Sequence, residues 1–248
     1  FMEECRRMGV EVLGPCINES DMSFAVNARG QVRFGLTGVK GVGEKAVESI
    51  IEERLEHGPY KTVYDFAQRS NTRSVNRKAY ENLVYGGAFD CFELSRAQFF
   101  AKSETVQLTG IERLIKYAND YQNTQNSSQS SLFGGSVASY IPEPPMPETE
   151  EWALIERLKY EKEVIGIYLT GHPLDNYKVE LERFCNTTIA DLKMMQKARS
   201  GEGGEELMTA FANLRKRGEI CIGGLVGNVQ HKMTKTGKPF GTFVLEDY

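Results

Sequence analysis

The sequence has few of the residues that build metal centres or covalent cross-links. Among 248 residues it holds five cysteines and three histidines, and no two cysteines form a CxxC pair. The cysteines are scattered along the chain, at Cys5, Cys16, Cys91, Cys185 and Cys221. This spacing excludes the usual zinc-ligand patterns. We therefore expect a reduced, cytoplasmic chain without a metal or cofactor of its own.

Long apolar runs and catalytic clusters are missing as well. No run reaches the roughly 18 apolar residues of a membrane-spanning helix, and residues 1–7 lack the apolar core of a secretion signal. No Ser/His/Asp, Cys/His or metal–carboxylate set can be assembled from the sequence. We expect neither contact with a membrane nor a catalytic residue in this chain.

The overall charge is also low. The formal net charge is −4 and the sequence pI is about 5.6, which argues against a protein that coats nucleic acid with its whole surface but leaves local basic patches open. The chain opens on Phe1, and its last residues read as a strand with no partner following it. We expect a piece of a longer protein.

Helical patterns dominate the first half. Residues 2–8 read as the end of a helix, and residues 10–13 and 32–34 read as short extended pieces. Apolar residues at Val47, Ile50, Ile51 and Leu55 predict a helix that stops at Gly58. A second helix is expected from Asn76 to the glycine pair at residues 86–87.

The segment from residue 36 to residue 51 carries the strongest local pattern. It resembles the helix-hairpin-helix family, in which an x-Gly-apolar-Gly turn opens a helix. The glycines permit a tight turn, the apolar residue plugs between two helices, and free amides at the helix start face a phosphate. The predicted DNA-binding residues are Lys40, Gly41, Val42, Gly43 and Lys45.

Two other interpretations of this segment compete. One is a plain tight turn between packed helices. The other is a Walker loop, which requires Lys directly after its last glycine and then a hydroxyl residue, whereas Gly43 is followed by Glu44, Lys45 and Ala46. Basic residues outside the turn, at Arg69, Arg73, Arg77 and Lys78, would either widen a DNA footprint or form a solvated face.

An uncharged stretch separates the two halves of the chain. Its polar composition predicts a flexible linker, and a proline cluster after it favours extended backbone. The stretch holds one apolar pair, Leu132 and Phe133, preceded by Gln129. These three residues resemble the short peptide by which replication proteins dock on the bacterial sliding clamp. The alternative is a patch that folds back on its own domain.

The second half begins with a helical connector and ends with β patterns. Thr149 offers a cap for a helix whose apolar stripe, through Trp152 and Leu158, runs out at residues 171–173. Near the end, alternating residues flank a glycine-containing basic turn and predict a β-hairpin. Its predicted single-strand-binding residues are Lys232, Lys235, Lys238, Phe240 and Phe243, and the alternative is a solvated turn over a β core. Glycines at residues 223, 224 and 227 favour strand curvature and the start of a barrel.

The order of these motifs is similar to that in the alpha-subunit family of bacterial DNA polymerase III. The resemblance rests on residues 4–9, 34–51, 86–90, 129–134, 161–174 and 235–237. It implies an α+β multidomain chain: the end of a fingers domain (1–27), a helix-hairpin-helix clamp-binding domain (28–120), a flexible linker with the clamp peptide (121–147), a helical connector (148–213) and the first part of an OB-fold barrel (214–248).

The resemblance also implies a function. In that family, palm-domain aspartates with two Mg²⁺ ions synthesise DNA, and that region would lie upstream of Phe1, so this piece is expected to lack the activity. The expected partners are the sliding clamp, duplex and single-stranded DNA, and other subunits of the holoenzyme. One departure is that the helix before the hairpin, at residues 32–38, looks short and contains two glycines. A DNA-repair nuclease or ligase with the same hairpin, or a clamp-tethered scaffold without DNA contact, are the rival hypotheses.

Overall fold

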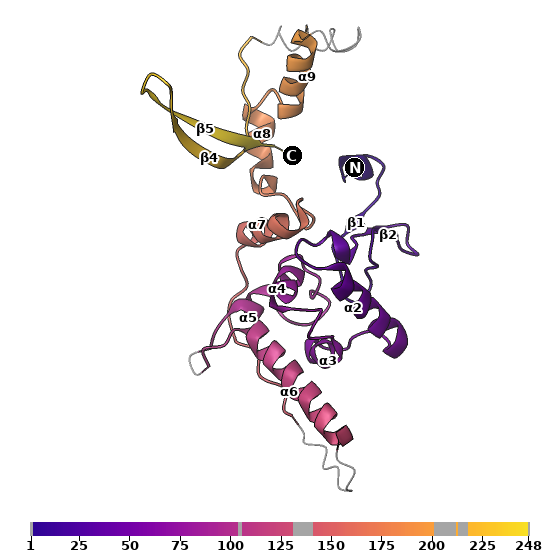
Figure 1. Ribbon diagram of the computed structural model, residues 1–248. Coiled ribbons are helices and arrows are strands. Elements are labelled where there is room, and N and C mark those ends of the chain that lie inside the picture. Colours follow the sequence, from indigo (N-terminus) through magenta and orange to yellow (C-terminus); the bar gives the residue numbers. More distant parts are fainter. Residues whose placement is uncertain (1, 104–105, 131–140, 201–211, 213–217, 248) are drawn as a thin grey trace. The chain divides into compact units, whose positions relative to one another are not determined.

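The computed structural model describes residues 2–103, 106–130, 141–200, 212 and 218–247 (Figure 1). It divides the chain into two compact units, Phe1–Thr170 and Gly171–Tyr248. The described part contains helices and two small sheets and no closed barrel. No helix in this part is long and apolar enough to cross a membrane.

The first unit is mostly helical. Its elements are α1 (Met2–Arg7), β1 (Val12–Leu13), β2 (Ala25–Val26), β3 (Val32–Arg33), the 3₁₀ turn η1 (Leu36–Gly38), α2 (Glu44–His57), α3 (Val63–Arg69), α4 (Arg77–Tyr85), α5 (Arg96–Phe100), α6 (Gly110–Ser130) and α7 (Leu154–Ile165). Strand β3 pairs in parallel with β1 and antiparallel with β2. The extended pieces predicted near residues 12 and 32 are confirmed as two strands of one small sheet.

The core of this unit is built around aromatic rings. The ring of Phe66 on α3 packs edge-on against Tyr60, Tyr80 and Phe89, with centroid separations of 5.0, 5.5 and 5.0 Å. Val47 and Ile50 of α2 are buried in the same cluster, as their spacing predicted. Leu55 is 78% exposed and lies outside the buried side of α2.

Capping side chains define several helix starts. Asn76 accepts a hydrogen bond from the Ala79 amide (3.0 Å) and opens α4 where the sequence predicted. Thr62 accepts from the Asp65 amide (3.1 Å) and opens α3, a helix that the apolar pattern did not predict because it is only seven residues long. Each cap satisfies an amide that has no acceptor inside its own helix.

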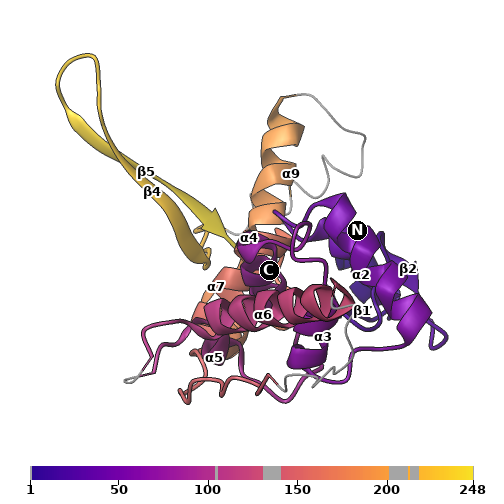
Figure 2. The ribbon, with the colours of Figure 1, turned by 60° about the horizontal axis from the view of Figure 1, so that its bottom comes forward.

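Helix α6 overturns the predicted start of the linker at residue 121, because it continues to Ser130. Figure 2 shows it running along α3 and α4. The physical reason lies in polar contacts that composition does not show. Gln122 donates to the Ser70 carbonyl (2.8 Å) and accepts from the Thr72 hydroxyl (3.0 Å), so a polar side chain fastens the helix to the loop before α4.

The proline-rich segment after residue 140 is extended, as predicted, but it is held on the first unit. The Tyr64 hydroxyl donates to the Pro144 carbonyl (2.8 Å), and Arg113 Nη1 donates to the Pro145 carbonyl (2.7 Å). Met146 packs against the core. Residues 141–147 are therefore not a free linker, because their carbonyls and side chains are bound by α3 and α6.

The next helix begins later and ends earlier than its sequence pattern predicted. Helix α7 starts at Leu154 rather than after Thr149, and it stops at Ile165, where Gly166 takes a left-handed φ of 88°. Glu151, before the helix, accepts hydrogen bonds from the amides of Arg96 and Ala97. The acidic residue before α7 thus caps α5 instead of its own helix.

The second unit holds short helices and a hairpin. Its elements are the 3₁₀ turn η2 (Asp175–Tyr177), α8 (Lys178–Phe184), α9 (Ile189–Arg199), β4 (Leu225–Met233) and β5 (Pro239–Glu246). Strands β4 and β5 pair antiparallel, with an irregularity between Gly227 and Gln230. The predicted hairpin with a basic turn at residues 234–238 is confirmed, whereas a barrel beyond it is not.

Candidate nucleic-acid interface

The predicted DNA-binding turn lies between η1 and α2. The first helix expected before it, at residues 32–38, is wrong: Val32 and Arg33 belong to β3, and only Leu36–Gly38 forms a single 3₁₀ turn. Gly35 cannot be replaced by a larger residue, because a Cβ there would lie 2.6 Å or less from backbone atoms of Ser23 and Met22. The crowding around this residue leaves room for one tight turn rather than a helix.

Gly41 is the residue that makes the turn possible. Its φ of 77° lies in the left-handed region, which residues with a Cβ rarely adopt. A Cβ at this position would also lie 2.5 Å from Nδ2 of Asn82. Gly43 is different, since its φ is −73° and nothing lies within 4 Å of a Cβ placed there. The sequence argument that both glycines are needed for a tight turn therefore holds only for Gly41.

Apolar side chains fix the turn against the core. Val39 and Val42 are buried, with 1% and 6% exposure, and Leu36 is fully buried. The Val42 amide donates to the Val39 carbonyl (3.2 Å). Val42 therefore packs as an apolar plug beneath the turn, as predicted, while Gly41 and Gly43 on either side of it are exposed.

Asn82 is a structural residue of the turn that the sequence analysis missed. It is 3% exposed on α4, and its Nδ2 donates to the carbonyl of Lys40. The Lys40 amide donates to the Val164 carbonyl of α7 (2.8 Å). A signal was present: Asn82 is a polar residue within the buried stripe formed by Ala79 and Leu83. Contacts with both α4 and α7 therefore hold the turn in place.

The start of α2 presents polar backbone beside basic side chains. Gly43 is its N-cap and supplies no side-chain acceptor. The Ala46 and Val47 amides donate to the Gly43 carbonyl (2.9 and 3.1 Å), which leaves the amides of Glu44 and Lys45 without an acceptor within the helix. Lys40 and Lys45 are exposed on either side. The aliphatic part of Lys78 on α4 reaches the same place, because its Cγ lies 3.8 Å from a Cβ built on Gly41. Glu44, in the same first turn, carries the opposite charge.

The other basic residues considered from the sequence divide into two groups. Arg69 is paired with Glu53 (3.0 Å) and Asp65 (3.1 Å) and is mostly buried. Arg77 is paired with Glu81 (2.9 Å) and Glu112 (2.7 Å), and its hydrogen bond with Glu81 is the largest contribution to its raised pKa. These two guanidinium groups serve internal ion pairs. Arg73 and Lys78 stay exposed.

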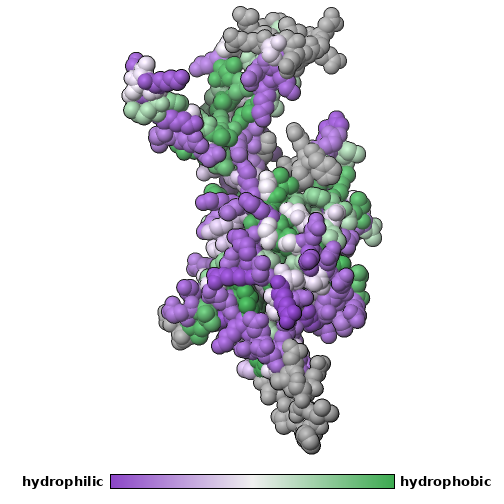
Figure 3. All heavy atoms as spheres, in the orientation of Figure 1, coloured by the Kyte–Doolittle hydropathy of each residue, from purple (hydrophilic) through white to green (hydrophobic). Residues whose placement is uncertain are grey.

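The predicted clamp-binding residues lie at the end of α6 or beyond it. Gln129 is in the last turn of that helix, whereas Leu132 and Phe133 lie outside the described residues. Both flanks belong to the first unit: α6 ends at Ser130, and Ile141 packs against the core. Figure 3 shows a mixture of hydrophilic and apolar residues on the face of this unit.

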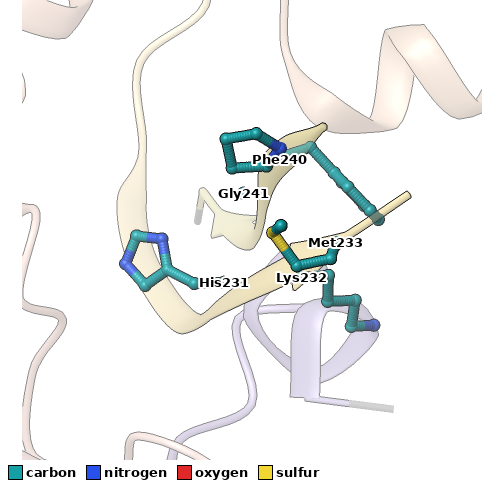
Figure 4. A pocket seen from close by; sticks show the side chains of 6 residues that line it. His231, Lys232, Met233, Phe240 and Gly241 are labelled. Carbon is teal, nitrogen blue, oxygen red and sulfur yellow. The ribbon is translucent and has the colours of Figure 1, made fainter. Parts of the chain in front are cut away.

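The predicted single-strand-binding residues all lie on the β4–β5 hairpin and are exposed. Lys232 pairs with Phe240 across the ladder, and both line a shallow pocket of about 370 Å³ (Figure 4). Paired residues share one face, and residues three apart on a strand point to opposite faces. Phe240 and Phe243 therefore lie on opposite faces of the hairpin. Lys235 and Lys238 lie at the turn.

Comparisons with known proteins agree with this geometry. Residues 9–99 match the family described as helix-hairpin-helix motif, which covers β1 through nearly all of α5. The turn and the matched residues thus define a helix-hairpin-helix domain within the first unit.

Longer similarities specify the family. The whole chain is 32% identical to DNA polymerase III subunit alpha of Pseudomonas aeruginosa and covers 20% of that protein. It is 33% identical over its whole length to the same subunit of Thermus aquaticus, covering 18% of it. With Pseudomonas fluorescens the identity is 35% over 93% of this chain and 20% of the relative. The chain belongs to the DNA polymerase III alpha-subunit family, and it spans about a fifth of the length of these relatives.

Proposed function

We propose that this chain is a DNA-handling region of a replicative polymerase and that the turn at residues 40–45 binds duplex DNA through a backbone phosphate. The observation that carries the proposal is the start of α2, where the Gly43 N-cap supplies no side-chain acceptor and the amides of Glu44 and Lys45 have none in the described residues. Amides at a helix start and nearby lysines attract phosphate without reading bases. The binding is therefore sequence-independent and falls as salt rises.

The affinity of this contact alone is modest. A single 3₁₀ turn replaces the first helix of the hairpin, so one helix start supplies the amides. Glu44 places a carboxylate in the same turn, and its charge opposes a phosphate there. A weak contact of this kind becomes effective when a second attachment raises the local concentration of DNA.

That second attachment is the sliding clamp. We assign its docking peptide to Gln129, Leu132 and Phe133, where an apolar pair follows polar sequence. Because both flanks of the peptide are held on the first unit, a clamp bound there is attached to the same unit as the helix-hairpin-helix turn. Duplex DNA passing through the clamp is then presented to Lys40 and Lys45.

The hairpin of the second unit is proposed to contact single-stranded DNA as the first part of an OB-fold barrel. Lys232 and Phe240 share a face, so a base can stack on the ring while the ammonium group meets a phosphate. Phe243 serves the opposite face. In the longer protein, DNA synthesis with Mg²⁺ and contacts with other holoenzyme subunits are proposed on the strength of the family alone.

A single substitution tests the duplex contact. Gly43→Asp places a carboxylate over the first-turn amides of α2, where it caps the helix and repels a phosphate. We expect at least about a tenfold loss of affinity for a labelled duplex in fluorescence anisotropy, with unchanged folding. Thr62→Asp is the matched control, because it adds the same charge at the N-cap of α3. Equal losses in both variants would contradict the proposal.

The clamp contact has its own test. Leu132→Ala combined with Phe133→Ala should abolish capture of this chain on an immobilised bacterial sliding clamp, because the pair supplies the apolar anchor. A Ser130→Ala and Ser131→Ala variant is the control and should bind like the original chain. Unchanged capture after loss of both apolar side chains would remove the assignment.

A further inference from the structure

Two thiols that are 75 positions apart in the sequence meet in the first unit. Cys16 follows β1, and Cys91 lies in the turn after α4. The Ile17 amide donates to the Ala88 carbonyl (2.9 Å), and Asn18 Nδ2 lies 3.9 Å from the Cys91 sulfur. The Cys91 sulfur also lies 3.9 Å from the Ala88 carbonyl oxygen, and both cysteines line the same pocket. The sequence, which shows scattered cysteines, gives no sign of this pair.

A pocket gives small molecules access to the pair. Cys16 and Cys91 both line a hollow of about 300 Å³, together with Gly14, Gly87 and Arg96. Cys16 is only 9% exposed, whereas Cys91 is exposed. A reagent that enters the hollow therefore meets one sheltered sulfur and one open sulfur side by side.

The surroundings make Cys16 the nucleophile of the pair. The hydrogen bond from the Cys91 thiol, helped by the backbone amides of Asn18 and Glu19, lowers the pKa of Cys16 to about 6 despite its burial. The same hydrogen bond raises the pKa of Cys91. Since the thiolate is the reactive form of cysteine, Cys16 is reactive at neutral pH.

We propose that Cys16 and Cys91 form a dithiol site that small disulfides of the glutathione class oxidise to an intramolecular disulfide. The Cys16 thiolate attacks one sulfur of the small disulfide, forms a mixed disulfide and releases one thiolate. Cys91 then gives up its proton to that thiolate and attacks the Cys16 sulfur, which releases the second small thiol. Two cysteine thiols are oxidised, and one small disulfide is reduced to two thiols.

The bond would close a chain segment that contains η1, α2, α3 and α4. A cross-link over so long a loop restricts the unfolded chain strongly. The oxidised protein should therefore melt on the order of 5–10 °C above the reduced protein. The pair shares no residue with the turn at residues 40–45, so loss of the cross-link and loss of the proposed DNA contact can be tested separately.

A second cysteine pair supplies an internal reference. Cys185 and Cys221 are adjacent in the second unit, where the Asn186 amide donates to the Cys221 carbonyl (3.0 Å). Here burial raises the pKa of Cys185, and the neighbouring Cys221 raises it further. Because its thiolate is disfavoured, Cys185 should react more slowly than Cys16 at neutral pH.

The experiment treats the reduced chain with oxidised glutathione, blocks remaining thiols by alkylation and maps the peptides by mass spectrometry. We expect a cross-linked peptide joining Cys16 to Cys91. Cys16→Ser should abolish that peptide and leave Cys91 free or as a glutathione adduct, whereas Cys221→Ser, the matched control, should retain it. If Cys16 and Cys91 are recovered alkylated, or Cys91 is joined to a different cysteine, the proposal is overturned.

The pH dependence in the unmodified chain tests the proposal without a variant. Attack of Cys16 on the small disulfide, followed as loss of the free Cys16 thiol, should speed up by less than about threefold between pH 7 and pH 9, because a thiol with a pKa near 6 is already ionised. A thiol with the ordinary pKa of 9.0 would gain about fiftyfold over that interval. A rise of more than about tenfold would overturn the proposal.

Discussion

Arg96 of α5 and Glu161 of α7 form a buried ion pair, with Nη1 and Oε2 3.6 Å apart and side-chain exposures of 5% and 0%. Arg96 also donates to Asp90 and to the Tyr85 carbonyl. Glu161 accepts from the Leu169 amide and from the amide and hydroxyl of Thr170. The pair therefore joins α5, α7 and the end of the first unit, and α7 in turn holds Lys40 through Val164.

Removal of this carboxylate should destabilise the first unit. In Glu161→Ala, the Arg96 guanidinium and two backbone amides lose a buried acceptor, and loss of one partner of a buried ion pair costs about 3–5 kcal/mol. Urea unfolding followed by circular dichroism measures the change. Glu163→Ala, on the exposed side of the same helix, should change the free energy of unfolding by less than about 0.5 kcal/mol. Similar losses of the free energy of unfolding in the two variants would contradict a stabilising role for the buried ion pair.

The two glycines of the turn should respond differently to alanine. Gly41→Ala forces a Cβ into a left-handed conformation against Asn82 and should cost about 1–3 kcal/mol. Gly43→Ala meets open space in an extended conformation and should leave thermal stability within about 1 kcal/mol. Melting temperatures of both variants check the difference. A Gly43 variant that is as unstable as the Gly41 variant would show that the turn geometry described here is incorrect.

Removal of its N-terminal cap should destabilise helix α6. The Thr109 amide donates to Glu112 (2.8 Å) and the Glu112 amide donates to the Thr109 hydroxyl (3.3 Å), which is a capping box. Thr109→Ala should therefore cost about 1 kcal/mol in urea unfolding. Thr124→Ala, farther along the same helix, is the comparison and should have the smaller effect.

The same cap gives a pH dependence. The Thr109 amide, with help from Arg77, holds the pKa of Glu112 below its ordinary 4.5. A lowered pKa stabilises the folded chain above pH 4.5, and this contribution is lost as the pH falls through the lowered value. The stability difference between the original chain and Glu112→Gln should therefore be present near pH 7 and shrink toward about pH 3. A difference that grows on acidification would contradict the assigned hydrogen bonds.

Much of the fold followed from local patterns. Apolar spacing at Val47 and Ile50, together with the Asn76 cap and the stop at Gly58, predicted α2 and α4 because such signals depend only on neighbouring residues. Helix α6 was not predicted, and residues from 121 onward were taken as linker, because the contacts of Gln122 with a distant loop cannot be seen in the local sequence. The cap on α5 was missed for a similar reason, since Glu151 reaches it across more than 50 positions.

The candidate site was predicted in part. The motif gave the location of the turn and the buried position of Val42. It did not give the 3₁₀ geometry before the turn, the support from Asn82 or the approach of Lys78, all of which depend on packing between η1 and α4. In contrast, the alternation of side chains along a strand could be read from the sequence alone, and it places Phe240 and Phe243 on opposite faces.

The salt dependence of duplex binding tests the central claim most directly. Each phosphate contact contributes about 0.9 to the slope of the logarithm of affinity against the logarithm of salt concentration. We predict that Lys40→Ala combined with Lys45→Ala lowers the steepness of that slope by about 1–2 and weakens binding to unrelated duplex sequences alike. Lys102→Ala combined with Lys116→Ala, at exposed positions outside the turn and α2, should leave the slope unchanged. An unchanged slope in the first variant, or an equal reduction in the second, would contradict the claim that this turn holds the DNA backbone.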